Sequence, residues 1–171
     1  MNLHDYLRDI PDFPKPGIVF KDITPLLRHP DAFRTCIERL VALAREHEPS
    51  LIAGIESRGL LFGAPLALEL GIGFIPIRKK GKLPAETSSV EFALEYGMDT
   101  LEIHNDGVDQ GQRVLVVDDV LATGGTASAA CELVEKVGGH VSGCLFVLEL
   151  GSLNGGDQLG SRKHQSLIRT P

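Results

Sequence analysis

Residues 113–127 read RVLVVDDVLATGGTA and combine three features in a row. Residues 114–117 form a short apolar run rich in β-branched side chains, which is typical of a strand buried on both faces. Two adjacent carboxylates, Asp118 and Asp119, follow this run. A loop of small, hydroxyl-bearing and glycine residues comes next, over residues 122–126. The stretch therefore predicts a buried parallel strand that leads into an acidic pair and a glycine-rich loop.

A helix is predicted directly after this loop. Apolar residues recur at helical spacing beyond Gly125, and Gly138-Gly139 suits the C-terminal stop. In open α/β sheets, ligands bind where a strand ends and a helix begins. The first amides of the helix lack intrahelical partners and the dipole is positive there, so this position favours a phosphate.

An acidic pair beside a phosphate-binding loop suits a phosphorylated ribose. Asp118 and Asp119 can accept hydrogen bonds from neighbouring ribose hydroxyls, while the loop offers backbone N–H groups to the phosphate. Gly124 and Gly125 allow a close backbone approach. No Gly-Lys-Ser/Thr follows the glycines, so the loop is not a nucleotide P-loop. The alternative is that the acids merely end a strand and that the loop is an ordinary turn.

The rest of the chain predicts strands that alternate with helices, and hence a mostly parallel sheet with helices on both faces. The expected helices span residues 2–9, 30–47 and 60–70. The expected strands span residues 51–55, 73–77, 141–148 and 166–168, with a hairpin over 92–96 and 100–103. We expect irregular chain over 10–25 with a few extended residues at 18–20, a mobile flap over 78–90, and no periodic structure over 151–163.

Size and composition indicate one soluble globular domain over residues 1–171, with 43% hydrophobic and 23% charged residues. The net charge of −6 argues against a nucleic-acid or anionic-membrane partner. The N-terminus is too polar for a signal peptide, and no apolar run approaches the roughly 18 residues of a membrane span. Cys36, Cys131 and Cys144 are far apart among apolar neighbours, which predicts buried reduced thiols and a cytoplasmic location. The six histidines lack paired ligand spacing, so a structural zinc or iron site is not expected.

Two further stretches could bind phosphate groups. Residues 54–59 read GIESRG at the end of the expected 51–55 strand, where Ser57 and Arg58 could grip a phosphate. The alternative is that Ser57 caps a helix and Arg58 points into solvent. Residues 78–82 read RKKGK, a local positive patch on an acidic chain that could steer a polyphosphate or belong to a closing lid. The alternative is a solvated surface run.

An acid in the expected hairpin completes the set of candidates. Residues 94–97 read LEYG, and Glu95 could exchange a proton with a heterocycle nitrogen if the flap folds over the site. An acid beside an aromatic residue at a hairpin is otherwise commonplace.

With these stretches in order, the chain resembles the type I phosphoribosyltransferases, and nearly its whole length resembles their adenine-specific branch. The signature VVDDVxATGGT carries the superfamily resemblance, while FPxPGIVFKDI over 13–23, RKKGKLP over 78–84, LEYG and LEI over 101–103 point to the branch. The resemblance implies the type I phosphoribosyltransferase fold, with a small base-binding hood segment over 1–30 and a flexible lid and hairpin over 78–104. It also implies a cytoplasmic homodimer of purine salvage.

The implied reaction joins adenine and phosphoribosyl pyrophosphate to give AMP and pyrophosphate, with Mg²⁺ held mainly through substrate and water rather than directly. Each implied role falls on a matching position of this chain. The 5′-phosphate would be bound by Ala122, Thr123, Gly124, Gly125 and Thr126, and the ribose hydroxyls by Asp118 and Asp119. Pyrophosphate would be bound by Glu56, Ser57, Arg58, Arg78, Lys79 and Lys82, with a cis peptide frequent in the family before the Ser57 position. Adenine would be framed by Val19, Phe20 and Lys21, with Arg58 and Glu95 as catalytic residues.

Some positions depart from the commonest pattern of the family. Lys21 stands where arginine is frequent, Ala85-Glu86 replaces a usual Gly-Pro, and Glu91 adds a charge to the lid. The departures at Ala85-Glu86 and Glu91 bear on lid closure and pyrophosphate affinity, whereas Lys21 matters little if backbone groups read the base. Two rival functions share the fold: a phosphoribosyltransferase for another nucleobase, and a non-catalytic regulator that senses phosphoribosyl pyrophosphate.

Overall fold

The computed structural model describes residues 1–94 and 96–171 of the chain. These residues divide into two compact units, Met1–Arg39 and Leu40–Pro171. The division falls within the long helix α2 (Pro30–Glu46). The organisation as one domain with a hood segment over 1–30 stays a prediction.

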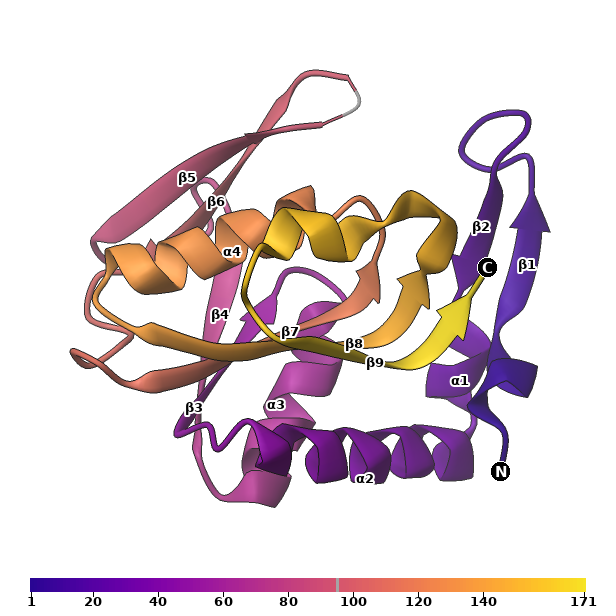
Figure 1. The fold of residues 1–171 in the computed structure, drawn as a ribbon, viewed down its shortest axis with the longest axis horizontal. Helices are drawn as coiled ribbons and strands as arrows, with labels where there is room; N and C mark the ends of the chain where they lie inside the picture. The colour runs from indigo at the N-terminus through magenta and orange to yellow at the C-terminus, as the bar shows by residue number, and fades with distance from the viewer. Residues whose placement is uncertain (95) are drawn as a thin grey trace. The chain divides into compact units, whose positions relative to one another are not determined.

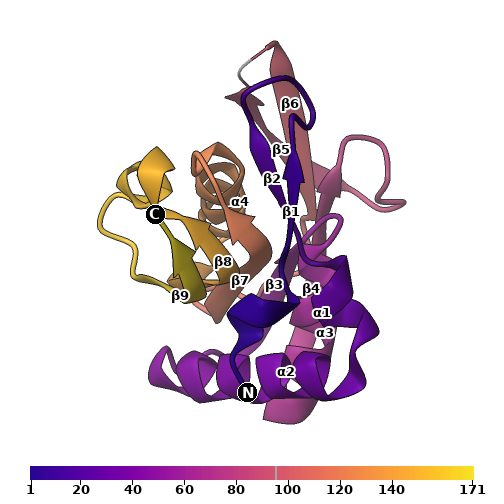
Figure 2. The same cartoon turned by 90° about the vertical axis from the view of Figure 1, so that its right-hand side faces the viewer.

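The first unit contains a two-stranded antiparallel ribbon, which Figure 2 shows as two strands side by side. Ion pairs tie its strands together: Arg8 Nη2 lies 2.6 Å from Asp22 Oδ2, and Lys21 Nζ lies 2.7 Å from Asp9 Oδ1. The predicted helix over 2–9 is wrong beyond residue 6. In the segment predicted as irregular over 10–25, the extended residues expected at 18–20 are confirmed in part by the strand Val19–Asp22, whereas the strand Arg8–Pro11 was not expected. The reason is that cross-strand pairing, and not local periodicity, orders these polar and proline-rich residues. The elements are η1 Leu3–Tyr6, β1 Arg8–Pro11, β2 Val19–Asp22 and α1 Thr24–Arg28, before α2.

The second unit is built on a seven-stranded sheet with the order β5-β6-β4-β3-β7-β8-β9 (Figure 1). Strands β4, β3, β7, β8 and β9 pair in parallel, while the β5–β6 hairpin adds antiparallel to β4. The mostly parallel sheet is therefore confirmed. Its strands are β3 Leu51–Ile55, β4 Gly73–Lys79, β5 Thr87–Ala93, β6 Met98–His104, β7 Arg113–Leu121, β8 His140–Leu150 and β9 His164–Thr170.

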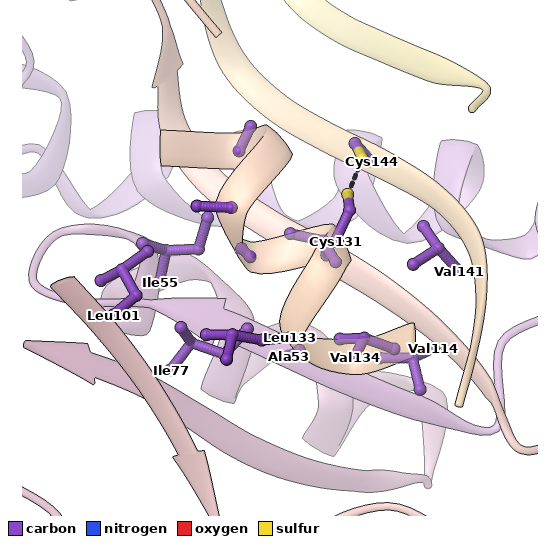
Figure 3. Close-up of a cluster of buried hydrophobic side chains, with 14 of the residues drawn as sticks. Ala53, Ile55, Ile77, Leu101, Val114, Cys131, Leu133, Val134, Val141 and Cys144 are labelled. Carbon is purple, nitrogen blue, oxygen red and sulfur yellow. Dashed lines mark hydrogen bonds between the residues drawn. The ribbon is translucent and has the colours of Figure 1, made fainter. Parts of the chain in front are cut away.

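Helices cover both faces of this sheet. Successive residues of β3 point to opposite faces, so neighbouring residues of this strand pack against different helices. Ala53 and Ile55 join the core beneath α4 (Gly125–Lys136), as the close-up in Figure 3 shows. Gly54 faces α3 (Gly59–Leu70), and Figure 1 shows α3 and α4 on the two sides of the strands. Helices on both faces are thus confirmed.

Several boundaries differ from the predicted ones. Strand β4 runs on to Lys79, because Arg78 and Lys79 pair with Glu102 and Leu101 of β6. Strand β5 begins within the predicted flap, and residues 151–163 contain two short 3-10 helices, η2 Gly151–Leu153 and η3 Gly155–Leu159. The helix over 30–47, the strand Leu51–Ile55, the hairpin and the edge strand β9 are confirmed.

The three cysteines are buried free thiols, as predicted. Burial raises the pKa of the Cys36 thiol to about 12. The Cys131 and Cys144 sulfurs lie 3.3 Å apart (Figure 3), and this hydrogen bond and burial raise the pKa of Cys144. Across the described residues, none of the helices is both long and apolar enough to cross a membrane. The cytoplasmic location stays a prediction.

Candidate active site

The two acids lie inside β7 rather than after it, since this strand continues to Leu121. Residues 122–126, called the phosphate loop below, then lead into α4. Gly124 adopts a left-handed conformation with φ of 87° and caps the helix, while Gly125 and Thr126 already belong to its first turn. The amides of that first turn have no intrahelical acceptors. The predicted arrangement of strand, loop and helix N-terminus is confirmed.

The turn at Glu56–Arg58 lies at the same edge of the sheet, because β3 and β7 are parallel neighbours. Its Glu56–Ser57 peptide is cis, as the resemblance implied. A side chain at Gly59 would lie 2.8 Å from the Val117 carbonyl oxygen and 2.9 Å from Asp118 Oδ1. The absence of a side chain there lets the start of α3 approach β7 closely.

An ion pair joins this turn to the acidic pair. Arg58 Nε donates to Asp119 Oδ2 over 2.5 Å, although 61 residues separate the two in sequence. Asp119 is only 4% exposed, whereas 48% of the Arg58 side chain remains exposed. One guanidinium therefore balances a buried carboxylate and still faces solvent, where it can contact an anion.

The surroundings of Asp118 disfavour its negative charge. Burial, followed by the neighbouring negative charge of Asp119, raises the pKa of Asp118 well above its usual value. Its Oδ1 accepts the Asp119 N–H over 2.8 Å. Its carboxylate therefore gains from a ligand that donates hydroxyl hydrogen bonds.

Two of the predicted cations of residues 78–82, Arg78 and Lys79, pair with carboxylates. Arg78 Nε lies 3.1 Å from Glu56 Oε2, which also accepts the Lys79 N–H over 2.9 Å. Although burial alone would raise the pKa of Glu56, these two donors lower it on balance. The Lys79 ammonium pairs with Asp99, and its hydrogen bond lowers the pKa of that carboxyl. Lys82 is exposed in the turn that follows.

The β5–β6 hairpin lies against the phosphate loop. A side chain at Gly125 would lie 3.7 Å from the Ala93 carbonyl oxygen and 3.8 Å from Phe92 Cδ2. At its other end, β5 is held by Lys136 Nζ of α4, which donates to the Ser89 carbonyl over 3.0 Å. Glu95, the predicted acid of this hairpin, lies outside the described residues.

The predicted adenine residues belong to the first unit. Val19, Phe20 and Lys21 follow one another along β2. The Phe20 ring meets the Phe13 ring edge to face, with centroids 5.3 Å apart. Val19 is 51% exposed. Their role in binding a base stays a prediction.

Sequence reasoning missed residues that hold the basic segment. Glu102 of β6 is 9% exposed and accepts the Gly81 N–H over 3.1 Å, which holds the turn after β4. The signal was available, because Glu102 interrupts two fully buried apolar residues, Leu101 and Ile103. Asp99, the partner of Lys79, has no comparable pattern of apolar neighbours in the sequence.

Comparison with known proteins identifies the class of enzyme to which this chain belongs. A family model described as phosphoribosyl transferase domain matches residues 22–159, which include the Glu56–Arg58 turn, the acidic pair and the phosphate loop. The chain therefore belongs to the phosphoribosyltransferases, and its fold is theirs.

Individual relatives narrow the class. The adenine phosphoribosyltransferase of Kosmotoga olearia is 56% identical over 98% of this chain and 99% of its own length. The crystal structure of the Thermoanaerobacter pseudethanolicus adenine phosphoribosyltransferase matches with a TM-score of 0.95 and 53% identity over 99% of this chain and 100% of that one. The Saccharomyces cerevisiae enzyme, solved with adenine and an imino-altritol bisphosphate, matches with a TM-score of 0.91 and 41% identity, covering 96% of each chain. This chain belongs to the adenine phosphoribosyltransferase family.

Proposed function

We propose that this chain transfers the 5-phosphoribosyl group from phosphoribosyl pyrophosphate to adenine, giving AMP and pyrophosphate in purine salvage. The observation that carries the proposal is the Arg58–Asp119 ion pair of 2.5 Å. It joins the Glu56–Arg58 turn to the acidic pair at the sheet edge where the phosphate loop also begins, which supports binding of a phosphorylated ribose there. Relatives named for this reaction, one of them solved with adenine, support the choice of base.

Binding of the activated sugar follows from the chemistry of the edge. The amides of residues 122–126 would hold the 5′-phosphate at the N-terminus of α4, where the helix dipole adds to hydrogen bonding. Asp118 and Asp119 would accept hydrogen bonds from the two ribose hydroxyls. These contacts fix the ribose and place negative charge beside the carbon that becomes cationic as its bond to pyrophosphate breaks.

Departure of pyrophosphate requires positive charge near the leaving oxygens. Arg58, Arg78, Lys79 and Lys82 would supply it, with Glu56 keeping Arg78 in place. Among the described residues, no cluster of three or more His, Cys, Asp or Glu side chains could hold a metal ion. Mg²⁺ would be held through diphosphate oxygens and water, where it would offset the charge on the leaving group.

Adenine would stack on Phe20 and meet the backbone of Val19 and Lys21, and Glu95 would give or take the proton at the purine N7.

We also propose a homodimer. Helix α3 supports this state, because Leu61 and Leu68 lie seven residues apart on it and are 45% and 80% exposed. A solution mass equal to one 18.4 kDa chain would contradict the dimer.

The reaction is tested by incubating the protein with Mg²⁺, phosphoribosyl pyrophosphate and each nucleobase in turn, followed by identification of the nucleotide. We expect AMP from adenine, at least 10²-fold less nucleotide from hypoxanthine, guanine, xanthine or orotate, and loss of product when the metal is chelated. Efficient formation of another nucleotide would show a different base specificity. Binding of phosphoribosyl pyrophosphate without any turnover would favour a sensor.

Asp118→Asn is expected to stabilise the fold and to weaken the binding of phosphoribosyl pyrophosphate. Asparagine keeps the acceptor for the Asp119 N–H but removes a buried charge beside a like charge, so the free energy of unfolding at pH 7 should rise by about 1 kcal/mol. Affinity for phosphoribosyl pyrophosphate should fall about tenfold, because a charged acceptor of ribose hydroxyls is lost.

The pH dependence of this stabilisation has a definite sign. The folded-state pKa of Asp118 is raised, so the wild-type penalty is complete above that pKa and disappears as the pH falls toward the unfolded value of 3.8. The stability difference between Asp118→Asn and wild type should therefore shrink on acidification. Chemical denaturation at several pH values measures this difference; a variant less stable than wild type at pH 7 would refute the charge argument.

A further inference from the structure

The segment that follows β8 lies in direct backbone contact with the phosphate loop. A side chain on Gly155 would overlap the Ala122 carbonyl oxygen and would come within 3.1 Å of Leu121 Cδ1. A side chain on Gly124 would in turn overlap the Gly155 carbonyl oxygen and would lie 2.9 Å from Gln158 Cβ. The two glycines thus bring two backbones together with no side chain between them.

Neither partner of this contact can easily move away. The segment that contains Gly155 is anchored by Leu159 of η3, which is fully buried in the core cluster that includes residues of α4. Just beyond it, Arg162 donates to both carboxylate oxygens of Glu135 on α4, each over 2.9 Å. On the other side, the phosphate loop continues from β7, which is paired with both β3 and β8.

We infer that Gly155 is a positioning residue: its backbone supports residues 122–124 from behind and sets where the loop amides point. This inference rests on the proposed function, because it assigns a role in holding the 5′-phosphate of the activated sugar. Hydrogen bonds to a phosphate weaken steeply when donors shift by a few tenths of an ångström. The segment over 151–163, which has no periodic pattern of its own, thereby acquires a part in substrate binding.

The test replaces Gly155 with alanine. The added methyl group must displace the Ala122 carbonyl, so we expect Kd and KM for phosphoribosyl pyrophosphate to rise about tenfold. The KM for adenine and kcat at saturation should stay within about twofold, because the reacting groups are untouched. Titration calorimetry and steady-state kinetics measure these values.

A second readout does not depend on catalysis. Hydrogen exchange of the amides in residues 122–126 should be faster in Gly155→Ala than in wild type, without ligand. If the wild-type protein bound no phosphoribosyl pyrophosphate, the proposed function would be refuted. Faster exchange in Gly155→Ala would in that case still support the contact between Gly155 and the loop. Unchanged exchange and unchanged affinity in Gly155→Ala would overturn the inference itself.

Gly156→Ala is the matched control. It makes the same substitution one residue later in η3, but its methyl group would meet the half-exposed His164 ring at 2.6 Å, which can turn away. This variant should bind phosphoribosyl pyrophosphate like wild type. Equal losses of affinity in both variants would mean a general disturbance of η3 and would overturn the role of Gly155.

A milder variant covers the case in which Gly155→Ala does not fold. Arg162→Met removes the ion pair with Glu135, a partly exposed contact whose loss the fold should tolerate. Loosening this end of the segment should raise the KM for phosphoribosyl pyrophosphate about twofold to threefold and leave the KM for adenine unchanged. An Arg162→Met enzyme with wild-type KM and wild-type loop exchange would contradict the inference.

Discussion

Replacing Arg58 with methionine is expected to lower kcat/KM for phosphoribosyl pyrophosphate by about 10²–10³-fold. The guanidinium is the proposed electrostatic partner of the leaving pyrophosphate, and its loss also leaves the buried Asp119 carboxylate without its 2.5 Å partner. The second effect should lower the free energy of unfolding by about 1–2 kcal/mol, a modest value because half of the Arg58 side chain is exposed. Steady-state kinetics and thermal denaturation measure the two effects separately.

A second substitution separates catalysis from stability. In the double variant Arg58→Met/Asp119→Asn, the unpaired charge is gone, so stability should recover while activity should not. Methionine at the exposed Arg45 serves as the control and should change neither quantity. Wild-type kcat/KM in Arg58→Met would remove Arg58 from the mechanism.

Replacing Glu95 with alanine is expected to lower kcat by about 10²-fold while both KM values change less than threefold. The carboxylate is proposed to take up or return the proton at the purine N7, a task that matters in the transition state more than in the bound substrates. Measurement of kcat against pH should show the loss of one ionisation in Glu95→Ala. The isosteric Glu95→Gln should behave in the same way.

Glu132→Ala is the control for loss of an acid, because Glu132 is an exposed acid on α4 that has no proposed part in binding or catalysis. Its kcat should stay close to that of wild type. Unchanged turnover of Glu95→Ala at saturating adenine and phosphoribosyl pyrophosphate would refute the proposed role of Glu95 in proton transfer.

Elements with strong local patterns could be predicted from the chain alone. Strand β3 was placed at its observed residues because five apolar or small residues stand between turn signals. The order of β7, loop and α4 could also be predicted, because the buried run, glycines and helical spacing are all local, although β7 runs on through the acidic pair to Leu121. The presence of the acidic pair and the phosphate loop at one sheet edge followed from parallel topology.

Elements without a local pattern were misjudged. Strand β1 contains Arg8, Asp9 and Pro11, a composition that does not favour a strand, and it exists because it pairs with β2. The end of β4 was placed too early, because its charged residues look solvated until Glu102 and Asp99 of β6 are seen beside them. In both cases the decisive partner is distant in sequence.

The amino-acid order alone specified the parts of the site: a buried strand, two acids, an amide-lined loop and a set of cations. Their connections came from the folded chain. The pairing of Arg58 with Asp119, the engagement of Arg78 with Glu56 and the backbone contact of Gly155 with the phosphate loop all join parts of the chain that lie 22 to 61 positions apart in sequence. Apolar periodicity is a property of neighbouring residues, whereas ion pairs and close backbone contacts depend on which surfaces packing brings together.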